Sequence, residues 1–162
     1  MTYTSTCLTI TDEGAAEAAA RLGGITPYTD WRKMLADEKP DVVVICMRHV
    51  DCHAEMAIAA AEAGAQGIFI EKPVGQTPAE ADAVIAACQK AGTKVGCAFV
   101  NRYSETFARV REMIDDGRIG QLLELRGRGK EDARGGGEDL WVLGSHILDM
   151  MASLGGAPQW CQ

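Results

Sequence analysis

The sequence lacks a long apolar run, an excess of basic residues and closely spaced cysteine pairs. No apolar stretch approaches the roughly 20 residues that span a bilayer, and residues 1–7 lack the basic flank and apolar core of a signal peptide. With 16 basic and 23 acidic side chains, the net charge of −7 argues against nucleic-acid or anionic-membrane partners. The six cysteines have no metal-binding spacing. These absences predict a reduced, cytoplasmic protein without a metal site.

The composition that remains is that of a soluble globular chain, with 47% hydrophobic and 24% charged residues. Its 162 residues suit one ordinary domain or two incomplete ones. Cys46 and Cys97 lie in apolar, strand-like runs and Cys88 lies in a helical one. We therefore expect most cysteines to be small core residues.

Between residues 7 and 99, short apolar runs alternate with alanine-rich segments. The expected strands are residues 7–10, 41–46, 67–71 and 94–99, and the expected helices are residues 13–22, a short segment around 31–35, 53–63 and 77–91. The last helix begins with a capping box, Thr77-Pro78-Ala79-Glu80. Continuous apolarity in residues 41–46 predicts burial on both faces. This order predicts an α/β fold with a doubly wound parallel sheet.

The pattern changes after residue 100. Residues 104–116 have the spacing of an amphipathic helix, residues 121–128 alternate like a strand, and residues 140–154 predict a final helix. One strand and one helix cannot bury a core, so these residues predict the beginning of a second domain. We expect a first domain over residues 1–119 and a second over 120–162, with the unpaired strand offering an edge for a homo-oligomer.

The segment Gly67–Pro73 places polar residues directly after a short buried strand. Proline disfavours helix in the residue before it, so Lys72 is expected to be extended at the carboxyl end of the strand. Ligands bind at this end of open α/β sheets. The competing interpretation is a solvated Glu71–Lys72 ion pair with no function.

Three segments together resemble the Gfo/Idh/MocA (glucose–fructose oxidoreductase / inositol dehydrogenase) family. They are "EKP" at 71–73, "GRIGQLLELRGRG" at 117–129 and "GGGEDLWVLGSHILD" at 135–149. Each motif is weak alone, but their order and spacing are specific. The resemblance implies a nicotinamide-dependent oxidoreductase that acts on sugars, cyclitols or related polyols. It also implies a Rossmann domain followed by an α/β domain that carries the substrate site and often a subunit interface.

The resemblance also implies roles for individual residues. Lys72 matches a lysine near the nicotinamide and the substrate hydroxyl, Glu71 matches a contact to the nicotinamide ribose, and His146 matches the family histidine. The resulting hypothesis assigns catalysis to Lys72 and His146, cofactor binding to Asp12, Met47, Arg48, His49, Glu71, Lys72 and Pro73, and substrate binding to Asn101, Arg102 and Asp149.

The chemistry of alcohol oxidation is compatible with these assignments. When hydride leaves the carbinol, the hydroxyl proton must leave too, and histidine or a desolvated lysine is a suitable base. His146 and Asp149 are three residues apart on the expected helix, so the carboxylate is placed to orient the imidazole. The alternative is that His146 is a structural histidine in an apolar helix.

The sequence departs from the family pattern at three places. Val142 occupies a position where the family often has an aspartate, so the usual lysine–aspartate–histidine trio is incomplete. The loop at residues 46–53 lacks the common Thr-Pro and is one residue longer, so Arg48 and His49 either replace its contacts to the nicotinamide or are solvated. The segment 101–103 resembles a stretch near the substrate, or alternatively Arg102 and Tyr103 cover a sheet edge.

The largest departure is the absence of a Gly-x-Gly-x-x-Gly turn, which would bind the pyrophosphate. Asp12 follows the first visible strand and matches the ribose-binding acid at the end of a second strand, which favours NAD slightly over NADP. We therefore expect a fragment truncated at both ends, with a partial Rossmann sheet that lacks its first βα unit. We expect weak nicotinamide binding and little turnover from it. The alternative function is a non-catalytic sugar-binding or assembly module.

Overall fold

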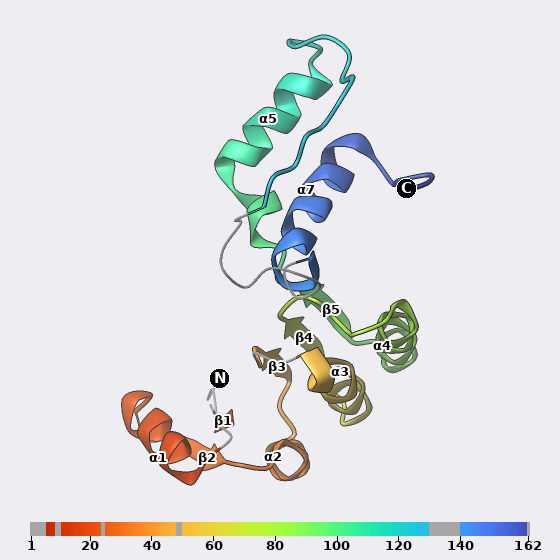
Figure 1. Cartoon of the computed structure of the whole chain (residues 1–162). Coiled ribbons are helices and arrows are strands. Elements are labelled where there is room, and N and C mark those ends of the chain that lie inside the picture. The colour runs from red at the N-terminus through yellow and green to blue at the C-terminus, as the bar shows by residue number, and fades with distance from the viewer. Residues whose placement is uncertain (1–5, 9–10, 24, 48–49, 130–139, 162) are drawn as a thin grey trace. The chain divides into compact units, whose positions relative to one another are not determined.

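The computed structural model describes residues 6–8, 11–23, 25–47, 50–129 and 140–161. The chain divides into two compact units, Met1–Gly96 and Cys97–Gln162 (Figure 1). The domain boundary expected after residue 119 stays a prediction.

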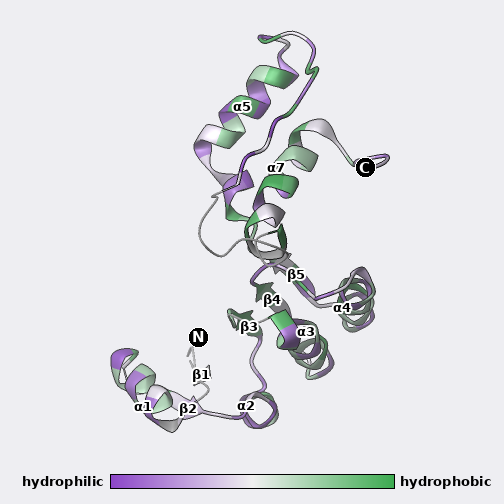
Figure 2. Ribbon diagram, in the orientation of Figure 1, coloured by the Kyte–Doolittle hydropathy of each residue, from purple (hydrophilic) through white to green (hydrophobic). Residues whose placement is uncertain are grey.

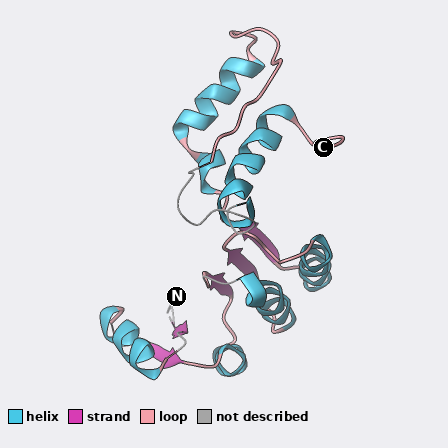
Figure 3. Ribbon diagram, in the orientation of Figure 1, coloured by secondary structure: helices cyan, strands magenta, loops and turns pink. Residues whose placement is uncertain are grey.

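The first unit contains two small parallel sheets. Strand β1 (Thr6–Leu8) pairs with β2 (Thr26–Tyr28), and the second sheet has the order β3 (Val42–Ile45), β4 (Gly67–Ile70) and β5 (Lys94–Cys97) (Figure 3). The parallel α/β class predicted from the sequence is therefore confirmed. Strand β2 was missed because its three residues include a proline and have no apolar alternation.

Four helices connect these strands: α1 (Asp12–Arg21), α2 (Trp31–Glu38), α3 (His53–Glu62) and α4 (Pro78–Ala91). A short 3-10 turn, η1 (Val50–Cys52), precedes α3. The predicted capping box is present at the start of α4, where Thr77 Oγ1 accepts from the Glu80 amide at 3.2 Å. In return, Glu80 Oε2 accepts from the Gln76 amide at 2.7 Å. These bonds satisfy two backbone donors and define where the helix begins.

One face of the three-stranded sheet is covered and the other is open. Val43, Ile45, Ile68 and Ile70 of β3 and β4 are buried. Helix α3 packs against both strands, and Figure 1 shows α3 and α4 on the same side of the sheet. On the opposite face, Val42 is 64% exposed and Val44 is 61% exposed. The prediction that residues 41–46 are buried on both faces is therefore wrong in this structure, because helices of the described chain cover only one side.

The cysteines differ from one another in burial. Cys88 is buried and Cys97 is half-buried, as expected for small core residues, whereas Cys46 is exposed at the end of β3. Burial raises the pKa of the Cys88 thiol. Burial also raises the pKa of the Cys52 thiol, with a further contribution from Asp51. Both shifts disfavour the reactive thiolate.

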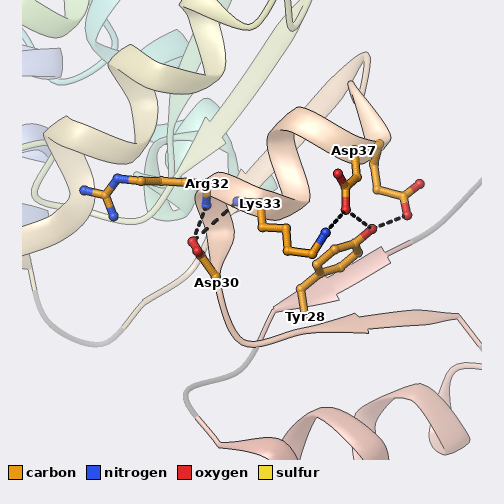
Figure 4. A network of polar contacts seen from close by, with 6 residues as sticks. Tyr28, Asp30, Arg32, Lys33 and Asp37 are labelled. Atoms are coloured by element: carbon orange, nitrogen blue, oxygen red, sulfur yellow. Dashed lines mark hydrogen bonds and ion pairs between the residues drawn. The ribbon is translucent and has the colours of Figure 1, made fainter.

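A polar network links β2 to α2 (Figure 4). The Tyr28 hydroxyl donates to Glu38 Oε1 at 2.8 Å and lies 3.5 Å from Asp37 Oδ2. Lys33 Nζ donates to the same Asp37 oxygen at 2.5 Å. The hydrogen bond to Glu38 is the main cause that raises the pKa of Tyr28 to about 12.

This pKa predicts a late phase in the alkaline titration. Because the folded pKa of Tyr28 lies above its ordinary value of 10.0, the neutral phenol stabilises the fold below pH 10.0, and this contribution is lost as the pH rises towards about 12. Tyr28→Phe should remove the phase near pH 12 from the tyrosinate absorbance. An unchanged late phase in that variant would contradict the assignment.

The second unit contains a 3-10 turn, η2 (Val100–Tyr103), helix α5 (Glu105–Asp115), one π-helical turn (Leu140–Gly144) and helix α7 (Ser145–Gly155). Figure 2 shows α5 with mixed polar and apolar residues and α7 as mostly apolar. The helix expected over residues 140–154 is thus present, although its first turn is π-helical.

The strand expected at residues 121–128 is wrong in this structure. These residues follow α7 closely, since a Cβ added at Gly127 would overlap Ile147 and lie 2.9 Å from Met151 Sδ. They nevertheless form no ladder, because no other strand in the described part of the second unit pairs with them. Alternating apolarity identifies an extended segment, but a strand also requires a neighbour.

The described residues contain neither a membrane-spanning helix nor a cluster of metal ligands. Within them, no helix has the length and apolarity required to cross a membrane. The same residues contain no group of three or more histidine, cysteine, aspartate or glutamate side chains arranged to hold a metal ion.

Candidate active site

The carboxyl ends of β3 and β4 lie at the same level of the sheet. Ile45 and Ile70 are the last paired residues of the two strands. One step further, the Glu71 amide donates to the Ile45 carbonyl oxygen at 2.8 Å. The loop that begins at Cys46 and the segment that begins at Glu71 therefore leave the sheet side by side, at the edge where parallel α/β proteins bind ligands.

Glu71, Lys72 and Pro73 are all half-buried at this edge. Glu71 Oε2 accepts from the Lys72 amide at 3.2 Å, which fixes the carboxylate to the backbone. The Lys72–Pro73 peptide is cis. A carboxylate and an ammonium thus flank the strand end, where one can accept hydrogen bonds and the other can donate them.

His53, which the sequence-based hypothesis did not include, connects the two loops. Its side chain is 1% exposed and comes from the first residue of α3. Nδ1 lies 2.8 Å from the Pro73 carbonyl oxygen, and Nε2 lies 2.8 Å from the Met47 carbonyl oxygen. The only signal in the sequence was a histidine that opens an alanine-rich helix directly after the atypical loop.

His146 lies on α7 in the second unit. Among the described residues, its Nδ1 atom is buried and has no hydrogen-bond partner. The ring meets Phe99 edge to face, with centroids 6.0 Å apart and planes at 87°. An unpaired buried nitrogen costs free energy, so His146 carries an unsatisfied polar atom in this structure.

Asp149 does not orient His146 as expected, because it pairs with Arg102. Arg102 Nε donates to Asp149 Oδ2 at 2.9 Å and Nη2 donates to Oδ1 at 2.5 Å. Nη2 also lies 3.3 Å from the Asp149 carbonyl oxygen. The carboxylate is 11% exposed and the guanidinium side chain is 34% exposed. This two-pronged contact joins η2 to α7 and keeps both groups half-buried.

The other predicted residues have the following positions. Asn101 is exposed in η2, Met47 is half-buried after β3, and Asp12 is the first residue of α1. Arg48 and His49 lie outside the described residues. The roles of all these residues in cofactor or substrate binding stay predictions, as do the catalytic roles of Lys72 and His146.

Polar groups at the carboxyl ends of parallel strands are the usual ligand-binding arrangement of open α/β proteins. Residues 2–99 match the family model described as "Oxidoreductase family, NAD-binding Rossmann fold" (GFO_IDH_MocA). The chain therefore belongs to the Gfo/Idh/MocA oxidoreductase family, as its motifs predicted.

Several curated relatives are named as dehydrogenases. Levoglucosan dehydrogenase of Pseudarthrobacter phenanthrenivorans is 38% identical over 121 residues, which are 74% of this chain and 30% of that protein. Inositol 2-dehydrogenase of Salmonella typhimurium is 36% identical over 102 residues, which are 62% of this chain and 30% of that protein. The chain thus spans about a third of the length of these relatives.

Solved structures show the same fold. The complex of levoglucosan dehydrogenase with NADH and levoglucosan has a TM-score of 0.83 at 31% identity, covering 94% of this chain and 45% of that one. Myo-inositol 2-dehydrogenase from Lactobacillus plantarum has a TM-score of 0.81 at 24% identity, covering 93% of this chain and 48% of that one. Because the second match has only 24% identity, it supports the fold alone.

Proposed function

We propose that this chain carries part of the active site of an NAD-dependent oxidoreductase. The reaction would transfer hydride between the nicotinamide and a secondary alcohol of a sugar, inositol or related polyol. The observation that carries the proposal is the position of Glu71 and Lys72 at the carboxyl end of a parallel strand in a chain of this family. The names of the levoglucosan and inositol dehydrogenases support the substrate class.

The residues at the strand ends would bind the nicotinamide nucleotide. The Glu71 carboxylate would accept from ribose hydroxyls, and Met47 and Pro73 would line the same edge. The family resemblance assigns cofactor binding to Arg48 and His49 as well. Asp12, at the start of α1, would accept from the adenosine ribose and repel a 2′-phosphate, so NAD is favoured over NADP. When bound, the cofactor supplies the hydride acceptor or donor.

Residues of the chain would handle the proton and the substrate. Lys72 would bind the reacting hydroxyl through Nζ, and the His146 imidazole would accept or return its proton. Asn101 and the Arg102–Asp149 pair would bind the other hydroxyls. Although Arg102 occupies both Asp149 oxygens, each oxygen has a second lone pair that can accept from a sugar.

The test uses the 162-residue chain with NAD or NADH and a panel that includes levoglucosan and myo-inositol. Because the sequence has no Gly-x-Gly-x-x-Gly turn, we expect weak cofactor binding by calorimetry, so turnover is measured at high cofactor concentration. Lys72→Ala should lower turnover by about 100-fold or more. Lys90→Ala, at an exposed position of α4, is the matched control.

The outcomes of this test distinguish an oxidoreductase from a non-catalytic sugar-binding module. Turnover that falls with Lys72→Ala but not with Lys90→Ala supports the oxidoreductase. Sugar binding without any change in NADH absorbance would instead favour the non-catalytic sugar-binding module. Tight NAD binding would contradict the expected effect of the missing glycine turn.

A further inference from the structure

Lys72 lies between two backbone anchors. On its amino-terminal side, the Glu71 amide donates to the Ile45 carbonyl oxygen at 2.8 Å. On its carboxyl-terminal side, the Pro73 carbonyl oxygen lies 2.8 Å from His53 Nδ1. The first anchor belongs to the sheet, whereas the second depends on a single side chain.

That side chain also contacts the neighbouring loop. His53 Nε2 lies 2.8 Å from the Met47 carbonyl oxygen, and the whole side chain is 1% exposed. Carbonyl oxygens only accept hydrogen bonds, so a ring with one proton donates to one of the two oxygens and a ring with two protons donates to both. A ring with both protons would tie the loop after β3 to the loop after β4, through a side chain that is almost fully buried.

We propose that His53 is a positioning residue for Lys72, acting through the hydrogen bond from Nδ1 to the Pro73 carbonyl oxygen. When Nε2 also carries a proton, it donates to the Met47 carbonyl oxygen, so that Met47 is aligned with the same segment. The inference rests on the proposed function for the importance of Lys72, but the hydrogen bond itself can be tested without it.

The ring geometry supplies a matched pair of variants. In His53→Asn, the side-chain amide nitrogen can occupy roughly the place of Nδ1 and keep the donation to Pro73. In His53→Gln, it can occupy roughly the place of Nε2 and keep the donation to Met47. Glu62→Gln, at an exposed position of the same helix, is the control.

The first readout is amide hydrogen exchange by NMR without cofactor. In His53→Gln, exchange of the Glu71 and Lys72 amides should rise about tenfold, the size expected for a lost hydrogen bond. In His53→Asn it should change by less than about twofold. The Lys94 amide, which donates to the Gln66 carbonyl oxygen at 2.9 Å at the other end of β4, should be unchanged in both.

The second readout needs no variant. In the unmodified chain, ¹⁵N NMR of the imidazole should find a proton on Nδ1, because only a protonated Nδ1 can donate to Pro73. An unprotonated Nδ1 would overturn the proposal. Equal exchange in the Asn and Gln variants, or an equal rise at Lys94, would show a general structural role and would also overturn it.

The third readout connects the hydrogen bond to function. NADH affinity should fall more in His53→Gln than in His53→Asn. The variant with the larger rise in Lys72 amide exchange should thus also show the larger loss of affinity. If the unmodified chain shows neither NADH binding nor turnover, the proposed function fails, while the exchange and imidazole results still decide the hydrogen bond. If NADH binds but both variants bind it like the unmodified chain, the positioning role fails.

Discussion

Replacing Arg102 with methionine should lower the free energy of unfolding of the second unit by about 2–3 kcal/mol. The substitution removes the guanidinium that forms a bidentate contact with the Asp149 carboxylate, which is 11% exposed. The expected loss is below that of a fully buried pair because a third of the Arg102 side chain reaches solvent. Urea unfolding followed by circular dichroism, together with amide exchange within α7, measures the effect.

Two further variants test the cause. Arg109→Met removes the exposed pair of Arg109 with Glu112 in the same unit and should cost less than about 1 kcal/mol. The double variant Arg102→Met, Asp149→Leu should recover most of the lost stability, because apolar replacement of both partners is often neutral. If the double variant is as unstable as Arg102→Met alone, packing of the arginine rather than the unpaired carboxylate explains the loss.

Gly127→Ala should destabilise the second unit by about 1–3 kcal/mol, the usual cost of overpacking. The added methyl group would overlap Ile147 and lie 2.9 Å from Met151 Sδ, so the 121–129 segment and α7 would have to separate. The same urea and exchange measurements apply.

Gly129→Ala is a suitable control for that prediction. At Gly129, two residues along the same segment, the nearest atom to an added Cβ is Ile147 Cδ1 at 3.9 Å, an ordinary contact. This variant should change stability by less than about 0.5 kcal/mol. Equal effects at the two glycines would mean that the close approach at Gly127 does not determine the packing.

The features that the sequence predicted well are local ones. The capping box of α4 involves residues four positions apart at most, and the parallel strands β3 and β4 are continuous apolar runs. Such signals act within one element, so they can be recognised before any tertiary contact is known.

The features that were missed depend on distant partners. Whether residues 121–128 form a strand depends on a neighbouring strand, and whether Val42 and Val44 are buried depends on helices packed against them. Asp149 is oriented by an arginine 47 residues away, and His53 contacts a carbonyl oxygen 20 residues away. Helix spacing placed Asp149 beside His146, but tertiary pairing decided its partner.

The contact between His53 Nε2 and the Met47 carbonyl oxygen closes a small ring of chain from residue 47 to residue 53. In flexible loops the entropic cost of closure rises only slowly with length, by about 0.6 kcal/mol per doubling, but short loops deviate strongly from this rule. The register of the two strand ends therefore depends on the geometry of this short segment as well as on closure entropy.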